Sequence, residues 1–180
     1  MKHQSLFVKA LKQSDSKDEA FTRLVQEYKE RLYWHIRKIV LDHDDANDVV
    51  QNTFIKVHLN IENFNENSTL FTWMYRIATN EALNFIKSKA KKIGLKNEEW
   101  IEAIADNLEA DPFFDGDEAA LILQKEISKL PEKQRIVFNM RYFDEMNYDS
   151  ISEILDTSVG ALKASYHHAV KKIKTKLTND

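Results

Sequence analysis

The chain has 180 residues and no cysteine, which excludes a disulfide framework, a thiolate metal site and a cysteine nucleophile. Its three glycines and two prolines argue against an all-β chain with many turns and favour helices. The formal net charge of −3 gives no global indication of nucleic-acid binding. No apolar run approaches the roughly 20 residues that a membrane span needs, and the first residues lack the apolar core of a signal peptide. We therefore expect a cytoplasmic protein without direct membrane insertion.

Charge changes sign along the chain. Residues 1–96 hold 16 Lys and Arg against 12 acids, residues 97–126 hold one Lys against ten acids, and residues 127–180 hold nine bases against seven acids. An acidic segment between two basic ones predicts an all-α protein of two small helical domains joined by an acidic flexible linker. The expected boundaries are 1–94, 95–117 and 118–180, with some transient helix in the linker around Glu98–Leu108.

In the first half, apolar spacing predicts a bundle of about four helices. A short helix covers 3–13, and a longer one begins near Ala20 and carries apolar residues to Ile39. The segment "LDHDDAND" offers several N-caps for a third helix, and "ENFNENST" interrupts the pattern before a fourth that ends near residue 92.

The acid-rich start of the third helix allows two interpretations. A metal site would use Asp42, His43, Asp44, Asp45, Asp48 and His58. However, only Asp44 and Asp48 have i,i+4 spacing, and the Glu-x-x-His pairs of a helical di-metal enzyme are absent, so we predict neither metal nor cofactor. A docking surface for a basic protein partner fits better. Its carboxylates and amides, which suit arginine, belong to Asp45, Asp48, Gln51 and Asn52.

The fourth helix has two distinct sides. Leu70, Met74 and Ala78 lie in an inward sector, whereas a second side combines an aromatic ring, amides and cations within about 80°. The second side consists of Trp73, Arg76, Asn80, Asn84 and Lys87. Ring faces, amides and charges are what unstacked bases and their backbone require. The alternative is a buried Trp73 beside an ordinary solvated face.

The second half predicts helices at about 118–129, 131–141, 148–155 and 159–177, and the last two have the rhythm of a helix-turn-helix. Asp156 tolerates the left-handed conformation that such a turn often needs, and Ser158 is a good N-cap. The outer side of the last helix has small residues followed by histidines and lysine, which suits a major groove. It comprises Ala161, Lys163, Ala164, Ser165, His167, His168 and Lys171. An ordinary helical hairpin with a solvated lysine face is the alternative.

Three blocks in this order, "DDANDVVQNTFIKVH", "FTWMYRIATNEALNFIKS" and "LPEKQRIVFNMRYFDEMNYDSISEILDTSVGALKASYHHAVKKIK", resemble the group IV, extracytoplasmic-function bacterial sigma factors. The resemblance covers nearly the whole chain except the acidic linker. It implies that the first block binds the clamp helices of core RNA polymerase, with Phe54 joining the docking residues. It implies that the second melts the −10 promoter element. The loop that would capture a flipped base contributes Phe64, Asn65, Asn67, Ser68 and Thr69. The third block would read the −35 element.

The chain departs from the family pattern in the last block. Relatives often carry Arg where this chain has Ser165, His168 and Val170, and loss of Arg removes bidentate guanine contacts. We therefore expect a weaker phosphate grip and more apolar contact between Ala161, Ala164 and thymine methyl groups. The acidic linker either imitates nucleic acid in a basic channel of the polymerase or is simply a soluble spacer.

The resulting hypothesis is a sigma factor, a subunit without its own chemistry that directs promoter-specific initiation. Its predicted partners are core RNA polymerase and promoter DNA, and an anti-sigma factor is a further candidate because many relatives are held silent by one. Two rival hypotheses are a free-standing helix-turn-helix regulator and a helical metal-dependent hydrolase built on Asp42–Asp48 and His58.

Overall fold

The computed structural model describes residues 2–13, 15–111 and 117–178. These residues form nine α-helices and two short 3₁₀ helices and contain no strand, so the predicted all-α fold is confirmed. The helices are α1 (Lys2–Lys12), α2 (Lys17–Val40), α3 (His43–Asn60), η1 (Ile61–Asn63), α4 (Leu70–Lys92), α5 (Asn97–Asp106), η2 (Leu108–Ala110), α6 (Glu118–Ser128), α7 (Glu132–Tyr142), α8 (Tyr148–Leu155) and α9 (Val159–Leu177). No helix in the described part of the chain is long and apolar enough to cross a membrane.

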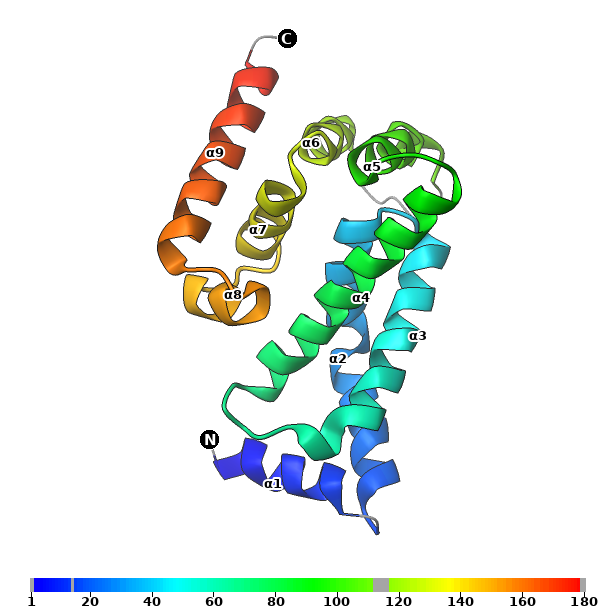
Figure 1. Ribbon diagram of the computed structural model, residues 1–180, viewed down its shortest axis with the longest axis vertical. Helices are drawn as coiled ribbons and strands as arrows, with labels where there is room; N and C mark the ends of the chain where they lie inside the picture. Colours follow the sequence, from blue (N-terminus) through cyan, green and yellow to red (C-terminus); the bar gives the residue numbers. More distant parts are fainter. Residues whose placement is uncertain (1, 14, 112–116, 179–180) are drawn as a thin grey trace.

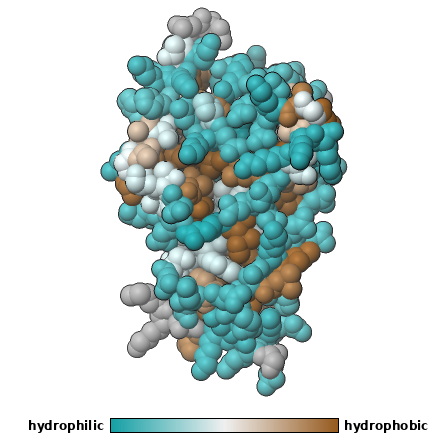
Figure 2. Space-filling model, in the orientation of Figure 1, coloured by the Kyte–Doolittle hydropathy of each residue, from teal (hydrophilic) through white to brown (hydrophobic). Residues whose placement is uncertain are grey.

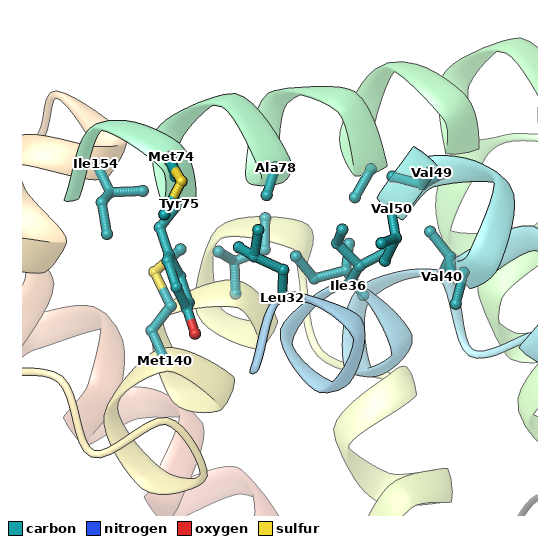
Figure 3. Close-up of a cluster of buried hydrophobic side chains, with 14 of the residues drawn as sticks. Leu32, Ile36, Val40, Val49, Val50, Met74, Tyr75, Ala78, Met140 and Ile154 are labelled. Carbon is teal, nitrogen blue, oxygen red and sulfur yellow. The ribbon is translucent and has the colours of Figure 1, made fainter. Parts of the chain in front are cut away.

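Three long helices, α2, α3 and α4, lie side by side, and α1 crosses one end of them (Figure 1). The apolar positions of α2 recur at helical spacing and face inward, where Leu24, Leu32 and Ile36 have no exposed surface. Figure 3 shows Leu32 and Ile36 of α2 beneath α4, with Val49 and Val50 of α3 on the side of Ile36. The four-helix bundle predicted for the first half is therefore confirmed.

Helices α6 to α9 complete the second half, with bounds within a few residues of those predicted. A separate apolar cluster holds α6, α7 and α9 together, and it consists of Ile127, Leu130, Phe138, Ala169 and Ile173. Between α8 and α9, Asp156 adopts the left-handed conformation with φ of 49°, and Ser158 caps α9 by accepting from the Ala161 amide. The predicted helix-turn-helix is present.

The described part of the predicted linker is a packed helix rather than an extended tether. Trp100 and Ile101 of α5 and Leu108 of η2 are buried, at 7%, 0% and 2% exposure. Their spacing places them on one face, whereas Glu98 and Glu102 remain exposed. The acids therefore occupy the outer face of an amphipathic helix. Residues 112–116, which belong to the same predicted linker, lie outside the described residues.

The two halves of the chain also share a core, which the sequence did not indicate. Helix α4 packs against α8, and α2 packs against α7. In Figure 3, Met140 of α7 and Ile154 of α8 lie beside Met74 and Tyr75 of α4. The face of the molecule shown in Figure 2 is mostly hydrophilic, with several hydrophobic patches. The chain therefore folds its second half back onto its first.

Candidate nucleic-acid interface

The outward side of α4 presents the row of side chains predicted to contact DNA. The helix begins after Thr69, whose hydroxyl accepts a hydrogen bond from the Thr72 amide at 3.1 Å and thereby fixes where the row starts. The exposed members are Arg76, Asn80, Asn84 and Lys87, and Trp73 is half-buried. Amides flanked by cations can bind base edges and phosphates along one strip.

The loop before α4 divides into a buried ring and an exposed polar part. Phe64 is only 2% exposed, its ring centroid lies 5.1 Å from that of Trp73, and its carbonyl accepts from Lys12 Nζ at 2.5 Å. In this conformation the ring of Phe64 packs against that of Trp73 and is shielded from solvent. Asn65, Asn67 and Thr69 are exposed and Ser68 is half-exposed, so the polar atoms of the loop remain accessible.

On α3, the predicted docking residues differ in accessibility. Asp48, Gln51 and Asn52 are exposed, whereas Asp45 is half-buried and accepts from Lys89 Nζ at 2.9 Å. Phe54 is 8% exposed and packs edge-on against the ring of Phe21, so its ring belongs to the core. Among the residues that the structure describes, no group of three or more His, Cys, Asp or Glu could hold a metal ion. Of the predicted docking residues, Asp48, Gln51 and Asn52 are therefore the ones accessible to a partner.

The outer side of α9 is open to solvent. Its accessible members are Ala161, Lys163, Ala164, His167, His168 and Lys171, and Ser165 is half-buried. The Lys163 ammonium lies 5.8 Å from the centroid of the Tyr148 ring in α8, a cation–π distance. Small residues near the start of the helix and cations further along match what entry into a major groove requires.

Part of the α4 row faces α8 rather than open solvent. The Arg76 guanidinium donates to the backbone carbonyl of Glu153. Asn80 lines the same cleft, which has a volume of about 510 Å³ and is closed on its other side by the α8–α9 turn and by Ser165 of α9. The fold therefore brings the two predicted DNA-contacting surfaces together at one cleft.

Comparison with known proteins identifies the family. The model of Sigma-70 region 2 matches residues 24–92, and that of Sigma-70, region 4 matches residues 120–173. The ECF RNA polymerase sigma factor SigW of Bacillus subtilis is 30% identical over 178 residues, which cover 94% of each chain. This chain belongs to the ECF family of RNA polymerase sigma factors.

Other similar proteins agree. The ECF RNA polymerase sigma-E factor of Haemophilus influenzae is 30% identical over 180 residues, covering 94% of this chain and 93% of that one. The structure of CnrH in complex with the cytosolic domain of CnrY has a TM-score of 0.71 at 21% identity, covering 98% of this chain and 97% of CnrH. RpoE from Bartonella quintana, in complex with the anti-sigma factor NepR, has a TM-score of 0.68 at 18% identity, covering 89% of this chain and 98% of that one. Both of these structures share the fold of this chain.

As a group IV sigma factor, the protein acts with core RNA polymerase in promoter-specific transcription initiation, so its class is that of a transcription factor. The region 2 match extends over α2, α3 and α4. Membership in this family therefore gives a common role to the acidic helix α3 and to the α4 row. The two rival hypotheses do not.

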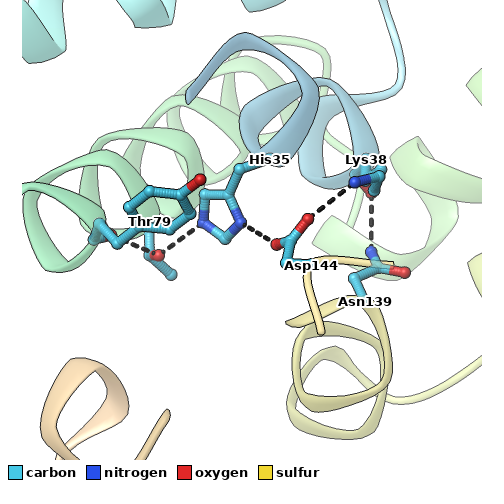
Figure 4. A network of polar contacts seen from close by, with 6 residues as sticks. His35, Lys38, Thr79, Asn139 and Asp144 are labelled. Carbon is cyan, nitrogen blue, oxygen red and sulfur yellow. Dashed lines mark hydrogen bonds and ion pairs between the residues drawn. The ribbon is translucent and has the colours of Figure 1, made fainter. Parts of the chain in front are cut away.

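A polar cluster links the two halves of the sigma factor, and sequence reasoning missed it. His35 Nδ1 lies 2.7 Å from Asp144 Oδ2, and Lys38 Nζ donates to Asp144 Oδ1 at 2.7 Å (Figure 4). The Asn139 side-chain amide donates to the Lys38 carbonyl at 3.0 Å. His35 Nε2 lies 2.9 Å from the hydroxyl of Thr79 in α4. The sequence carried one indication: His35 adjoins Ile36 on the buried stripe of α2, where a polar residue requires a partner.

The cluster is well shielded from solvent, because the side chains of His35 and Asp144 are 1% and 8% exposed. Burial by itself raises the pKa of a carboxyl group. The hydrogen bond and charge of His35 and the ammonium of Lys38 outweigh burial, so the pKa of Asp144 lies below its ordinary value. Burial also raises the pKa of Tyr75, whose ring packs 4.7 Å from the His35 ring.

A second buried charged side chain, Arg135 of α7, lacks the hydrogen-bond partners that Asp144 has. Its side chain is 1% exposed, and none of its three guanidinium nitrogens has a hydrogen-bond partner. Burial lowers its pKa, and the charges of Glu132 and Glu98 compensate only in part. Arg135 therefore opposes the stability of this packed state.

Proposed function

We propose that this sigma factor divides its work among three surfaces. The exposed acidic part of α3 binds core RNA polymerase, the α4 row with its preceding loop binds the opened −10 element, and α9 reads the −35 element. Residues 1–94 and 118–180 are then the two functional domains, and residues 95–117 connect them. The observation that carries this proposal is the exposed row from Arg76 to Lys87 on a helix whose other side is core.

On α4, each chemical group of the row suits one part of a single strand. The Asn80 and Asn84 amides can donate to and accept from a base edge, while Arg76 and Lys87 can neutralise flanking phosphates. Trp73 is half-buried and rests on Phe64, which gives it a fixed orientation from which its free edge can stack on the first unpaired base. Phe64 contributes by positioning this ring.

On α3, the polymerase-binding role depends chiefly on Asp48, because Asp45 already has a cation beside it. An exposed carboxylate flanked by the Gln51 and Asn52 amides suits an arginine of a basic partner. The exposed apolar side chains Ile55 and Leu59 continue the same helix, at 49% and 69% exposure, and enlarge the surface that a partner could bury.

On α9, the exposed Ala161 and Ala164 can contact thymine methyl groups in the −35 element. Lys163, His167, His168 and Lys171 then bind phosphates, and the half-buried Ser165 can hydrogen-bond to a base edge or to the backbone. No arginine is available on this side for a bidentate guanine contact, so readout depends on shape and apolar contact.

An anti-sigma factor is a further partner that we propose for this chain. Two solved structures of similar fold are complexes, one with the cytosolic domain of CnrY and the other with the anti-sigma factor NepR. A sigma factor that works with RNA polymerase has to reside in the cytoplasm, and the proposal therefore includes that location.

The test is a reconstitution with core RNA polymerase and a library of promoter DNA. Transcripts should require both proteins. Asp48→Ala should weaken the polymerase complex by about tenfold, since it removes the free carboxylate from a charged interface. Glu19→Ala, which removes an exposed carboxylate from the first turn of α2, is the matched control. Tight operator binding without polymerase would instead favour a free-standing regulator.

A further inference from the structure

We infer that binding of the −35 element by this sigma factor is coupled to proton uptake by two adjacent histidines of α9, His167 and His168. In this coupling each imidazole holds a DNA phosphate only in its protonated, positively charged form. The inference rests on the proposed role of α9 and adds a dependence on pH to it. It concerns the conditions under which α9 binds DNA.

The two histidines lie on the exposed outer side of α9. His167 is four residues after Lys163 and four residues before Lys171, which places it between these lysines on one side of the helix. Adjacent residues of a helix point about 100° apart, and the centroids of the two imidazole rings are 6.0 Å apart. The rings can therefore reach two separate phosphates.

The ring nitrogens of this histidine pair are available to a ligand. Among the residues that the structure describes, no group forms a hydrogen bond with either ring. Two other histidines differ, because the ring nitrogens of His35 and of His43 lie within hydrogen-bond distance of neighbouring side chains. Histidine is the side chain whose charge ordinarily changes between about pH 5 and 8. The pair can therefore act as a pH-dependent group on the DNA-contacting side of α9.

The charges of α9 itself around the pair are all positive. From Thr157 to Asn179 the chain contains no acidic residue and no arginine. The nearest lysines along the helix are Lys163, Lys171 and Lys172. An ammonium group disfavours a second positive charge beside it. No group of α9 can therefore balance an imidazolium, whereas an anion from outside the chain can.

The neighbouring helices add one carboxylate to this environment. Glu126 and Lys129 of α6 line the groove of about 490 Å³ that also contains His168. The Glu126 carboxylate accepts from Lys129 Nζ at 2.6 Å, so it is already paired. Helix α8 contributes the ring of Tyr148 on the side of Lys163, and α7 packs against the buried side of α9. The other charged residues of the groove are Lys171, Lys172 and Lys176. Positive charges around the pair therefore outnumber negative ones.

Duplex DNA reverses this balance of charge. A phosphate beside an imidazole favours the protonated form, which offers N–H donors at both ring nitrogens. The two equilibria are linked, so bound DNA raises the proton affinity of the ring by the same factor by which the bound proton raises the affinity for DNA. Binding must therefore take up protons, and the affinity for DNA must increase as the pH falls from about 8 to about 5. The variant His168→Arg would carry its charge throughout this range and would abolish its part of the dependence.

The experiment uses holoenzyme reconstituted with core RNA polymerase and a −35 duplex, cut from a promoter recovered from the library so that it lacks the −10 element. Fluorescence anisotropy measures the affinity from about pH 5.5 to about pH 8.5 at constant ionic strength. For wild type we expect the affinity to rise in acid by about 3- to 10-fold for each histidine. The slope of log affinity against log salt should steepen by about 1 for each imidazolium, because each neutralises one phosphate.

The double variant with His167→Gln and His168→Gln, measured with the same core polymerase, supplies the pH dependence of all other groups. The rise in affinity should be present in wild type and absent from this variant, and His168→Arg should keep only the part that belongs to His167. A wild-type pH profile equal to that of the double variant overturns the inference. A pH dependence without any change in the salt slope also overturns it, because the imidazoles would then bind something other than phosphate.

Lys171→Ala separates the inference from the proposed role of α9, because it retains both histidines. If Lys171→Ala weakens binding of the duplex while wild type and the double variant share one pH profile, α9 binds DNA and only the proton coupling is wrong. If Lys171→Ala and the double variant both bind the duplex as wild type does at every pH, α9 does not contact the −35 element, and the proposed function of this helix fails.

Discussion

Replacing Asp144 by Asn should lower the stability of the free protein in a pH-dependent way. The substitution keeps the size of the side chain but removes the charge that His35 Nδ1 and Lys38 Nζ contact at 2.7 Å each. Removal of one member of a buried ion pair costs about 3 to 5 kcal/mol. Lys38 is 17% exposed and recovers some hydration, so we take the lower figure of about 3 kcal/mol. For a protein of this size that corresponds to a decrease in Tm of about 6 to 12 °C.

The pH dependence follows from the lowered pKa of Asp144. A carboxyl group whose pKa is lower in the folded than in the unfolded state binds protons more readily when unfolded. Its contribution is therefore fully present above the ordinary value of 3.8 and is lost as the pH falls below that value toward the folded pKa. The difference between wild type and Asp144→Asn should be constant near neutral pH and shrink in acid.

Urea denaturation followed by circular dichroism at pH 7 and at acid pH measures this difference. Asp149→Asn serves as the control, because its carboxylate is exposed in the first turn of α8 and its loss should cost no more than about 0.5 kcal/mol. If Asp144→Asn is as stable as this control at pH 7, or if its deficit grows in acid, the reasoning about the polar cluster around Asp144 is refuted.

Three further predictions concern residues outside the polar cluster around Asp144. Arg135→Met should raise the free energy of unfolding by about 1 to 3 kcal/mol in urea titrations, because it replaces an unpartnered buried charge by an apolar chain of similar volume; a loss of stability would point to a bond that the guanidinium makes. Trp100→Ala should cost about 3 kcal/mol and speed amide exchange mainly in α5, whereas uniform protection would mean that α5 does not need this ring. Lys171→Ala should reduce the slope of log affinity for −35 duplex DNA against log salt by about 1, and an unchanged slope would place that lysine away from phosphate.

Local patterns in the sequence were sufficient for the helices on either side of the acidic segment. The stripe from Leu24 to Ile39 and the caps at Asp42, Thr69 and Ser158 are short-range features, and the structure contains each of them. The predicted site residues of α4 and α9 are exposed or half-buried, as helical spacing predicts for their outward sides, whereas Phe64, in the loop before α4, is buried. In the sequence, Phe64 lies among polar residues, and only the contact with Trp73 reveals that it is core.

Contacts between distant segments were not predictable in the same way. Nothing near Asp144 in the sequence indicates that its partners are His35 and Lys38, since ion pairing over that separation depends on how the halves pack. The helix α5 was underestimated because its acids obscured a short apolar stripe at Trp100 and Ile101. In both cases the burial of a helix face depends on which distant segment packs against it, and the sequence does not show that segment.

The central claim is that the α4 row of this sigma factor opens promoter DNA. The most direct measurement is permanganate reactivity of unpaired thymines in the −10 region of a promoter bound by the reconstituted polymerase. With wild-type protein we predict reactive thymines, and with Asn80→Ala a reduced signal at unchanged polymerase binding, because Asn80 is exposed on α4 and does not belong to the docking residues on α3. Full reactivity with Asn80→Ala, or equal loss of opening and polymerase binding, would contradict the claim.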